Sequence, residues 1–255
     1  MTFGVAYVAL DVQPNMLDKR DGHRARKRFG QHFLVDKAAI ERIVSFVEPL
    51  PGDVVVEVGP GRGALTRRLL ARLGQLTAVE IDRDLTAMLR DEFSADILHL
   101  IESDILRVGW GEMLPKNNGQ KLFMVGNLPY NITAPFLFKA LEEIDHLHTA
   151  VLMLQREVAR RLAARPGSKE YGQITVLLAM RAQITLLLDV DRRSFRPVPG
   201  VDSSVIKVDF SEEPRYANWP DGDEDDIEND QTCATSRCLS INENGDWSAD
   251  DCYQF

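Results

Sequence analysis

Residues 1–210 contain no cysteine, because all three cysteines of the chain are Cys233, Cys238 and Cys252. This part of the chain therefore has no disulfide framework, thiol nucleophile or thiolate metal site, and we predict no metal site. No apolar run approaches the roughly 20 residues that cross a bilayer. Residues 1–10 lack the basic leader and cleavage site of a secretory signal. These absences predict a cytoplasmic protein that does not associate with membranes.

The net charge of −9 is distributed unevenly along the chain. Residues 211–255 hold 13 of the 39 acidic residues and 2 of the 30 basic ones, which leaves residues 1–210 with 28 basic and 26 acidic side chains. An acidic segment with few apolar residues cannot bury enough surface to fold. We therefore predict an N-terminal extension at residues 1–22, one domain at residues 23–210, and a disordered acidic tail at residues 211–255.

An apolar run at residues 122–126 ends in Asn127, Leu128, Pro129 and Tyr130. An apolar run closed by Gly and Pro predicts a buried strand that ends in a tight loop. Open α/β sheets bind ligands at such carboxyl ends. There the Asn side chain and the neighbouring carbonyls can accept from a planar amine such as N6 of adenine, and the Tyr ring can stack on the base. A simple strand-to-helix turn would use the same residue types.

An earlier strand, predicted at residues 53–58, runs into a glycine-rich loop at residues 59–63. Glycines let the backbone approach a ligand closely, and the following helix directs its positive end at the loop. The next predicted strand carries Glu80, 21 residues after Gly59. A carboxylate at this place accepts hydrogen bonds from both hydroxyls of a ribose. Either NAD or S-adenosylmethionine satisfies this pattern.

Two further segments carry candidate binding groups. A strand predicted at residues 97–101 is followed by Asp104, whose carboxylate can accept from the exocyclic amine of an adenine. Residues 23–34 combine a basic cluster with aromatic side chains, which suits phosphate contact and base stacking. A solvated aspartate and a solvated basic arm are the alternative interpretations of these segments.

Seven strands are predicted, and the first five alternate with helical patterns. They lie at residues 53–58, 75–81, 97–101, 122–126, 151–154, 184–190 and 205–210. The last two form a late hairpin. The pattern predicts an α/β fold with a mostly parallel sheet that helices cover on both faces.

Four stretches, in this order, resemble motifs of the ribosomal RNA adenine N6-dimethyltransferases, specifically the small-subunit enzymes that confer kasugamycin sensitivity. They are RFGQHFL at 28–34, VEVGPG at 56–61, GNLPYN at 126–131 and FxPxPxVDS at 195–203. The resemblance covers residues 23–210. It implies a Rossmann-like methyltransferase with a seven-stranded sheet. Such an enzyme transfers methyl groups from S-adenosylmethionine to N6 of adenines in small-subunit ribosomal RNA, giving N6,N6-dimethyladenosine.

The resemblance also implies roles for individual residues. In the family, Asn127 and Tyr130 would hold the target adenine and Phe195 would flank it. The residues that would contact the cofactor are His32, Leu34, Gly59, Glu80, Asp104 and Asn127. His32 stands where many members carry Asn, and both side chains can hydrogen-bond. After Phe210 the family continues into a small helical domain that grips RNA, which the residues here do not resemble. The implied partner is small-subunit ribosomal RNA or a pre-small subunit, bound by a monomer.

Three other functions stay open at this point. A large-subunit rRNA adenine methylase of the macrolide-resistance kind is the nearest, although Leu128, in place of the Ile usual there, and the motif at 195–203 favour the small-subunit enzyme. A non-catalytic RNA-binding or ribosome-assembly factor on the same fold is the second. An NAD-dependent oxidoreductase is disfavoured, because no Tyr-Lys or His-Asp hydride-transfer pair follows the glycine loop.

Overall fold

The chain divides by its internal contacts into two units, Met1–Pro214 and Arg215–Phe255. The computed structural model describes residues 26, 30–115, 119–165, 168, 172–210, 240–241 and 247–248. In the second unit it describes one antiparallel pair, β10 (Ser240–Ile241) with β11 (Trp247–Ser248). The extension at residues 1–22 and the rest of the acidic tail lie outside the described residues.

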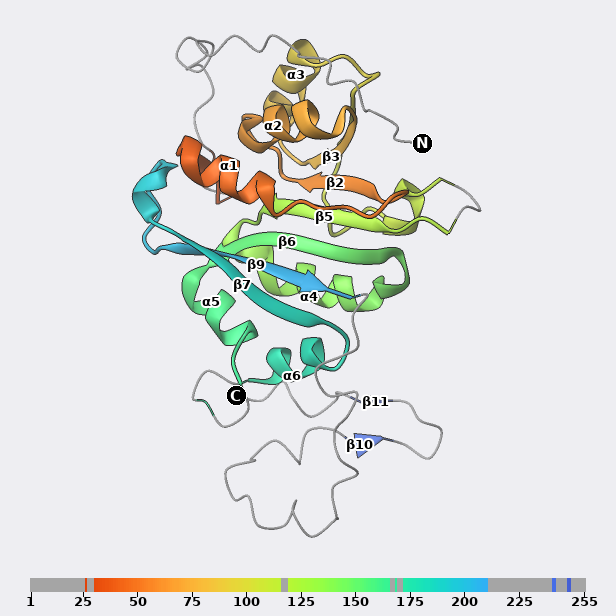
Figure 1. Ribbon diagram of the computed structural model, residues 1–255, viewed down its shortest axis with the longest axis vertical. Helices are drawn as coiled ribbons and strands as arrows, with labels where there is room; N and C mark the ends of the chain where they lie inside the picture. Colours follow the sequence, from red (N-terminus) through yellow and green to blue (C-terminus); the bar gives the residue numbers. More distant parts are fainter. Residues whose placement is uncertain are drawn as a thin grey trace, which may run out of the picture. The chain divides into compact units, whose positions relative to one another are not determined.

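A seven-stranded sheet forms the centre of the first unit (Figure 1). Its order is β4-β3-β2-β5-β6-β9-β7, and neighbouring strands from β4 to β6 pair in parallel. Strand β9 pairs antiparallel with both β6 and β7. The bounds are β2 (Val54–Val58), β3 (Leu76–Glu80), β4 (Leu98–Glu102), β5 (Leu122–Asn127), β6 (Leu147–Gln155), β7 (Gln183–Val190) and β9 (Ser203–Asp209). The predicted α/β fold and its late hairpin are confirmed.

Strand β6 is longer than the sequence predicts, because it begins at Leu147 instead of residue 151. The additional residues include the polar His148 and Thr149, and both are buried. His148 Nδ1 lies 2.7 Å from a carboxylate oxygen of Asp53, next to the start of β2. A buried polar group that has a hydrogen-bond partner is tolerated in a strand, so the strand continues through these residues.

Helices cover both faces of the sheet. On one face lie α1 (Lys37–Ser45), α2 (Ala64–Leu73) and α3 (Arg83–Glu92), and on the other α4 (Thr133–Glu142), α5 (Arg156–Leu162) and α6 (Gln173–Ala179). Successive strand residues point to opposite faces, and Val55 accordingly belongs to the first core while Val56 belongs to the second. In the described parts of the chain, no helix combines the length and apolar character needed to cross a membrane.

Glycines determine how β2 and β5 come together. A Cβ atom at Gly126 would stand 2.5 Å from the carbonyl oxygen of Val58, the residue paired with it across the two strands. Only glycine permits this approach. Gly63 caps α2 with a φ of +75°, in the left-handed region that favours glycine. The glycine loop and the loop after β5 are thereby held at the same edge of the sheet.

A short two-stranded sheet joins the first and last motifs. Strand β1 (Phe33–Leu34) pairs antiparallel with β8 (Phe195–Arg196). The Ser194 hydroxyl donates to the carboxylate of Asp36 at 2.9 Å, and Asp36 caps α1 by accepting from two backbone amides. The hydrogen bonds from the Ala39 backbone, the Ser194 hydroxyl and the Ala38 backbone lower the pKa of the Asp36 carboxyl. We call residues 30–34, together with Arg26, the entry arm. The pairing of β1 with β8 anchors this arm beside the motif at 195–203.

Candidate functional site

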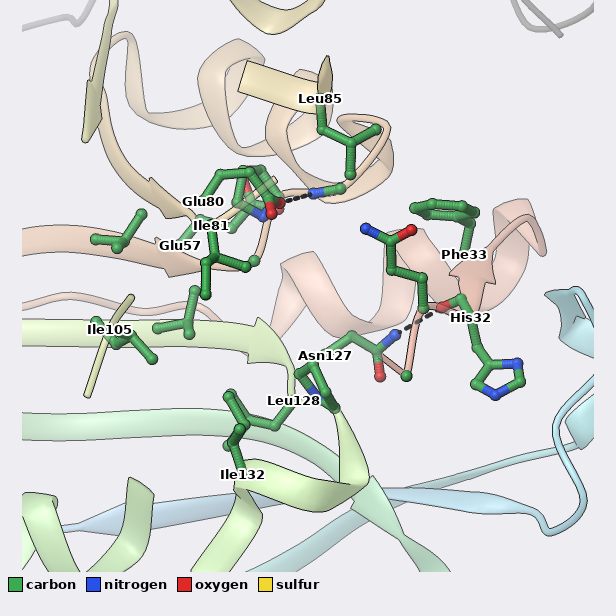
Figure 2. A pocket seen from close by; sticks show the side chains of 18 of the residues that line it. His32, Phe33, Glu57, Glu80, Ile81, Leu85, Ile105, Asn127, Leu128 and Ile132 are labelled. Carbon is green, nitrogen blue, oxygen red and sulfur yellow. Dashed lines mark hydrogen bonds between the residues drawn. The ribbon is translucent and has the colours of Figure 1, made fainter. Parts of the chain in front are cut away.

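A pocket of about 260 Å³ lies at the carboxyl ends of β2, β3 and β5 (Figure 2). Strands β2 and β5 are neighbours in the sheet without being consecutive in the chain, and α/β folds bind ligands at such a switch point. All eight residues that the sequence singled out line this pocket: His32, Leu34, Gly59, Glu80, Asp104, Asn127, Tyr130 and Phe195. Their individual roles stay predictions.

Asn127 is held by the entry arm. Its Nδ2 donates to the carbonyl oxygen of His32 at 3.1 Å, and Figure 2 shows this bond crossing from the end of β5 to the arm. An amide that donates with its nitrogen turns its oxygen the other way. The Oδ1 atom of Asn127 is therefore oriented as an acceptor.

Tyr130 begins a short 3-10 turn (Tyr130–Ile132) directly after Pro129. Its hydroxyl lies 3.3 Å from the Ser203 hydroxyl at the start of β9. Its ring lies 6.2 Å from the imidazole of His32, with 24° between the planes. Nδ1 of His32 in turn lies 2.8 Å from the carbonyl oxygen of Pro197. Two aromatic rings from distant segments are thus stacked at the pocket.

Glu80 ends β3 and is only 5% exposed. One carboxylate oxygen accepts from the backbone N–H of Gly61 at 3.1 Å and the other from that of Asp82 at 2.9 Å. Burial raises the pKa of Glu80, and these two N–H groups act against the rise because they stabilise the charged form. The carboxylate is therefore fixed beside the glycine loop, where the sequence placed a ribose.

The wall near Asp104 contains apolar residues that sequence reasoning missed. Asp104 accepts from the backbone N–H of Leu106 at 3.0 Å, which orients its carboxylate. Ile81 and Ile105 also line the pocket, and Ile81 is 45% exposed. An exposed isoleucine that lines the pocket suits the flat face of a base. The signal in the sequence that could have identified Ile81 is its position directly after Glu80.

Phe195 and Leu34 contribute to the wall from within the core. They face each other in the register of β8 and β1, and they are 1% and 6% exposed. Both belong to the core cluster beneath α1. The predicted contact of Phe195 with a target base is therefore limited to a small part of its ring in this arrangement.

Glu57 is a second buried carboxyl at the pocket. The sequence placed it in a strand and in the VEVGPG motif, without a role of its own. It is 1% exposed, and among the described residues its Oε2 atom has no hydrogen-bond partner. Burial raises the pKa of Glu57 to about 8. Thr66 and the charge of Arg67 oppose this rise, and the charge of Glu80 adds to it. The signal in the sequence was an acidic residue inside an apolar run.

The basic cluster at residues 23–28 was assigned to phosphate contact, and the structure describes Arg26 alone within it. Arg26 forms ion pairs with Asp82, at 3.1 Å, and with Asp84. The Arg26 charge is therefore already paired with two carboxylates, a contact that the sequence did not predict. The cause is that the arm folds against the first turn of α3, which carries two aspartates.

The sheet has a glycine loop after β2, a carboxylate at the end of β3 and an antiparallel last strand, β9. These features place the protein among the Rossmann-like methyltransferases. The family model described as "Ribosomal RNA adenine dimethylase" matches residues 22–221. The chain belongs to the ribosomal RNA adenine dimethylase family, and the resemblance seen in the sequence is confirmed. S-adenosylmethionine is therefore the cofactor, which decides between the two that the glycine loop left open.

The chain is similar to several known proteins of this kind. It is 47% identical to "Ribosomal RNA small subunit methyltransferase A" of Leptothrix cholodnii over 73% of this chain and 68% of that protein. Among solved structures, a dimethyladenosine transferase from Plasmodium falciparum aligns with a TM-score of 0.63 and 27% identity, covering 74% of this chain and 66% of that one. The 23S rRNA methyltransferase ErmE aligns with a TM-score of 0.62 and 33% identity, covering 72% and 71%.

Glu80→Ala is expected to weaken binding of S-adenosylmethionine by about 1.5–3 kcal/mol, the range for hydrogen bonds to a charged group. Calorimetric titration measures this directly. Glu102→Ala is the matched control, because Glu102 ends the neighbouring strand in register with Glu80 but pairs with Arg83 and Arg90. It should bind the cofactor normally. Equal affinity of the two variants would remove Glu80 from the site.

Proposed function

We propose that this pocket performs the family reaction on small-subunit ribosomal RNA, with Asn127 as the group that orients N6 of the target adenine. The observation that carries the proposal is the hydrogen bond from Nδ2 of Asn127 to the His32 carbonyl. Because the nitrogen donates to this carbonyl, Oδ1 is oriented to accept a hydrogen bond from a ligand. The product is N6,N6-dimethyladenosine, formed in two successive methyl transfers.

The residues at the pocket suit S-adenosylmethionine. A Cβ at Gly59 would meet no atom within 4 Å, so glycine keeps the space beside the loop clear. Glu80 offers carboxylate oxygens for the ribose hydroxyls, Asp104 an acceptor for the adenine amine, and Ile81 an apolar surface for the adenine ring. His32 and Leu34 complete the set from the entry arm. When bound, the cofactor supplies a methyl group on a sulfonium, which is already electrophilic.

The remaining task of the protein is to prepare N6. The N6 lone pair of adenine is delocalised into the ring, so the nitrogen is a weak nucleophile until acceptors hold its N–H groups and draw it toward sp3 geometry. In this proposal the acceptors are Oδ1 of Asn127 and the backbone carbonyls beside it. Alignment of the reacting atoms supplies most of the other help, and no general base is required.

Tyr130 is proposed to stack on the target adenine once the base has left its own stack. Tyr130→Ala should weaken productive binding roughly 10-fold or more, since stacking of a base on an aromatic ring contributes about 1–3 kcal/mol. Tyr130→Phe keeps the ring and loses only the 3.3 Å contact with Ser203, so it should be far milder. The measurement is kcat/KM on small ribosomal subunits. Equal damage by both changes would mean that the hydroxyl, and not the ring, matters.

The proposed substrate is tested with the purified full chain, labelled S-adenosylmethionine and separate small and large ribosomal subunits. We expect label in the RNA of small subunits, as dimethyladenosine. Label in large subunits alone would favour a large-subunit rRNA adenine methylase of the macrolide-resistance kind. The structural relative ErmE is named as a 23S rRNA methyltransferase. Tight RNA binding without any transfer would favour the non-catalytic assembly factor. Mapping the modified adenines would identify the target nucleotides.

The acidic tail is proposed to lie outside the catalytic unit. Strand β9 ends at Asp209, and Phe210 donates from its backbone to His148, so the sheet is complete by residue 210. Cutting the chain at about residue 212 should keep cofactor binding and strengthen RNA binding, because most of the 13 acidic residues of the tail no longer repel phosphate. The gain should be largest at low salt, where charges are least screened. Tighter RNA binding by the full chain would make the tail part of the RNA site.

The same proposal places the reaction in the cytoplasm and assigns it to a monomer. Light scattering of the purified chain, with and without RNA, measures the oligomeric state. A stable dimer would contradict this part of the proposal.

A further inference from the structure

The entry arm is attached to the pocket through a buried carboxylate, Asp82. This residue follows β3 and caps α3, where its side chain accepts from the backbone N–H of Asp84 at 3.1 Å. The Asp82 side chain is 0% exposed. Nη1 of Arg26 lies 3.1 Å from one of its oxygens, and Nε2 of Gln31 donates to the other at 2.9 Å. Two residues of the arm therefore converge on one carboxylate.

The backbone of Asp82 holds Glu80. Its N–H donates to one carboxylate oxygen of Glu80 at 2.9 Å, while Gly61 holds the other oxygen. The residue that receives the arm is therefore also the residue that aligns the proposed ribose acceptor. On the other side of the pocket, the arm continues into His32, whose carbonyl accepts from Asn127.

A buried charge makes this attachment strong. Removing one partner of a buried ion pair leaves the other charge uncompensated, which costs much more than losing an exposed pair. If the arm were undocked, Asp82 would lose both Arg26 and Gln31, and the segment that presents Glu80 would lose its support. Docking of the entry arm and binding of the cofactor both favour the state in which this segment is aligned. Each therefore strengthens the other by the same free energy.

On the basis of the proposed function, we propose that Asp82 is a positioning residue of the cofactor site: it couples docking of the entry arm to the alignment of Glu80, so that arm docking and cofactor binding strengthen each other. Asp82 itself touches neither the methyl group nor N6 in this scheme. Arg26 and Gln31 act through it.

The test is a calorimetric titration of the full chain with S-adenosylhomocysteine, the unreactive product of the cofactor. Asp82→Asn should weaken binding roughly 10–100-fold and Arg26→Ala roughly 10-fold, the effects of losing hydrogen bonds to a charged group. The double variant should bind less weakly than the two separate losses added together predict, because both changes break the Arg26–Asp82 pair. Arg26→Ala also breaks the pair with Asp84, which Asp82→Asn leaves in place. Asp91→Asn, exposed on the same helix, is the matched control and should bind normally. Independent, additive losses would overturn the coupling.

A second measurement separates positioning from general stability. S-adenosylhomocysteine should slow tryptic cleavage at residues 24–28 in the wild-type chain but not in Arg26→Ala, and Arg26→Lys should restore part of the protection. A purely structural role would lower the melting temperature and leave this ligand-dependent protection unchanged, which would overturn the proposal. If Asp82→Asn does not fold, the two Arg26 variants decide the question. Absence of binding by the wild-type chain would instead refute the proposed function on which the inference rests.

Discussion

Turnover by the Asn127→Ala variant is expected to fall roughly 10²–10³-fold, the range for removing a preorganised polar group at a reacting atom. Asn127 donates to the His32 carbonyl at 3.1 Å, so its Oδ1 is held in one orientation before substrate binds. This contact acts on the reacting nitrogen and contributes little to holding the rest of the RNA. RNA affinity should therefore change much less than turnover. Single-turnover methyl transfer and RNA binding, measured side by side, give the two quantities.

Two further variants sharpen this expectation. Gln155→Ala is the matched control: Gln155 carries an amide at the carboxyl end of the neighbouring strand β6 and is not among the described residues that line the pocket. It should retain turnover. Asn127→Asp keeps acceptor oxygens but cannot donate to the His32 carbonyl, so it should remain strongly impaired. Wild-type turnover by Asn127→Ala would exclude this side chain from the chemistry.

The location of the site was predictable from local sequence patterns. Glu80, Asp104 and Asn127 each stand at or just after the end of an apolar run, and parallel strands gather such ends at one edge of a sheet. Apolar runs and glycine loops are local signals. They were therefore sufficient to predict where the strands lie in the sequence and at which edge of the sheet the candidate side chains meet. The fold class followed from the same alternation of strands and helices.

Contacts between distant segments were not predictable in this way. The sequence has no local signal that Phe33 pairs with Arg196, or that the amide of Asn127 donates to His32. The basic cluster indicated phosphate contact because its composition is that of an RNA-binding arm, yet the fold places Arg26 against Asp82. Composition reports which charges are available, and tertiary structure decides which of them are already paired.

The environment of Glu57 was also not predictable from the sequence, because an acidic residue in an apolar run does not reveal whether the fold supplies it with a hydrogen-bond or charge partner. Burial raises the pKa of its carboxyl from 4.5 to about 8. Between these two values the folded protein keeps a proton that the unfolded chain has released, so stability falls as pH rises. The cost of burying the carboxyl is absent below pH 4.5, where both states are protonated. It grows by up to about 1.4 kcal/mol per pH unit and is constant above pH 8, where both states are ionised.

Glu57→Gln should therefore change the pH dependence of stability by on the order of a few kcal/mol. Glutamine keeps the shape of the protonated acid and never ionises, so the variant should gain stability relative to the wild-type chain between about pH 5 and about pH 9. Urea unfolding at each pH gives the difference in the free energy of unfolding, in which the titration of other groups largely cancels. Glu142→Gln, exposed on α4, is the control and should follow the wild-type profile. If the Glu57→Gln profile also ran parallel to the wild-type profile, the carboxyl would ionise alike in both states, and its proposed protonation at neutral pH would be wrong.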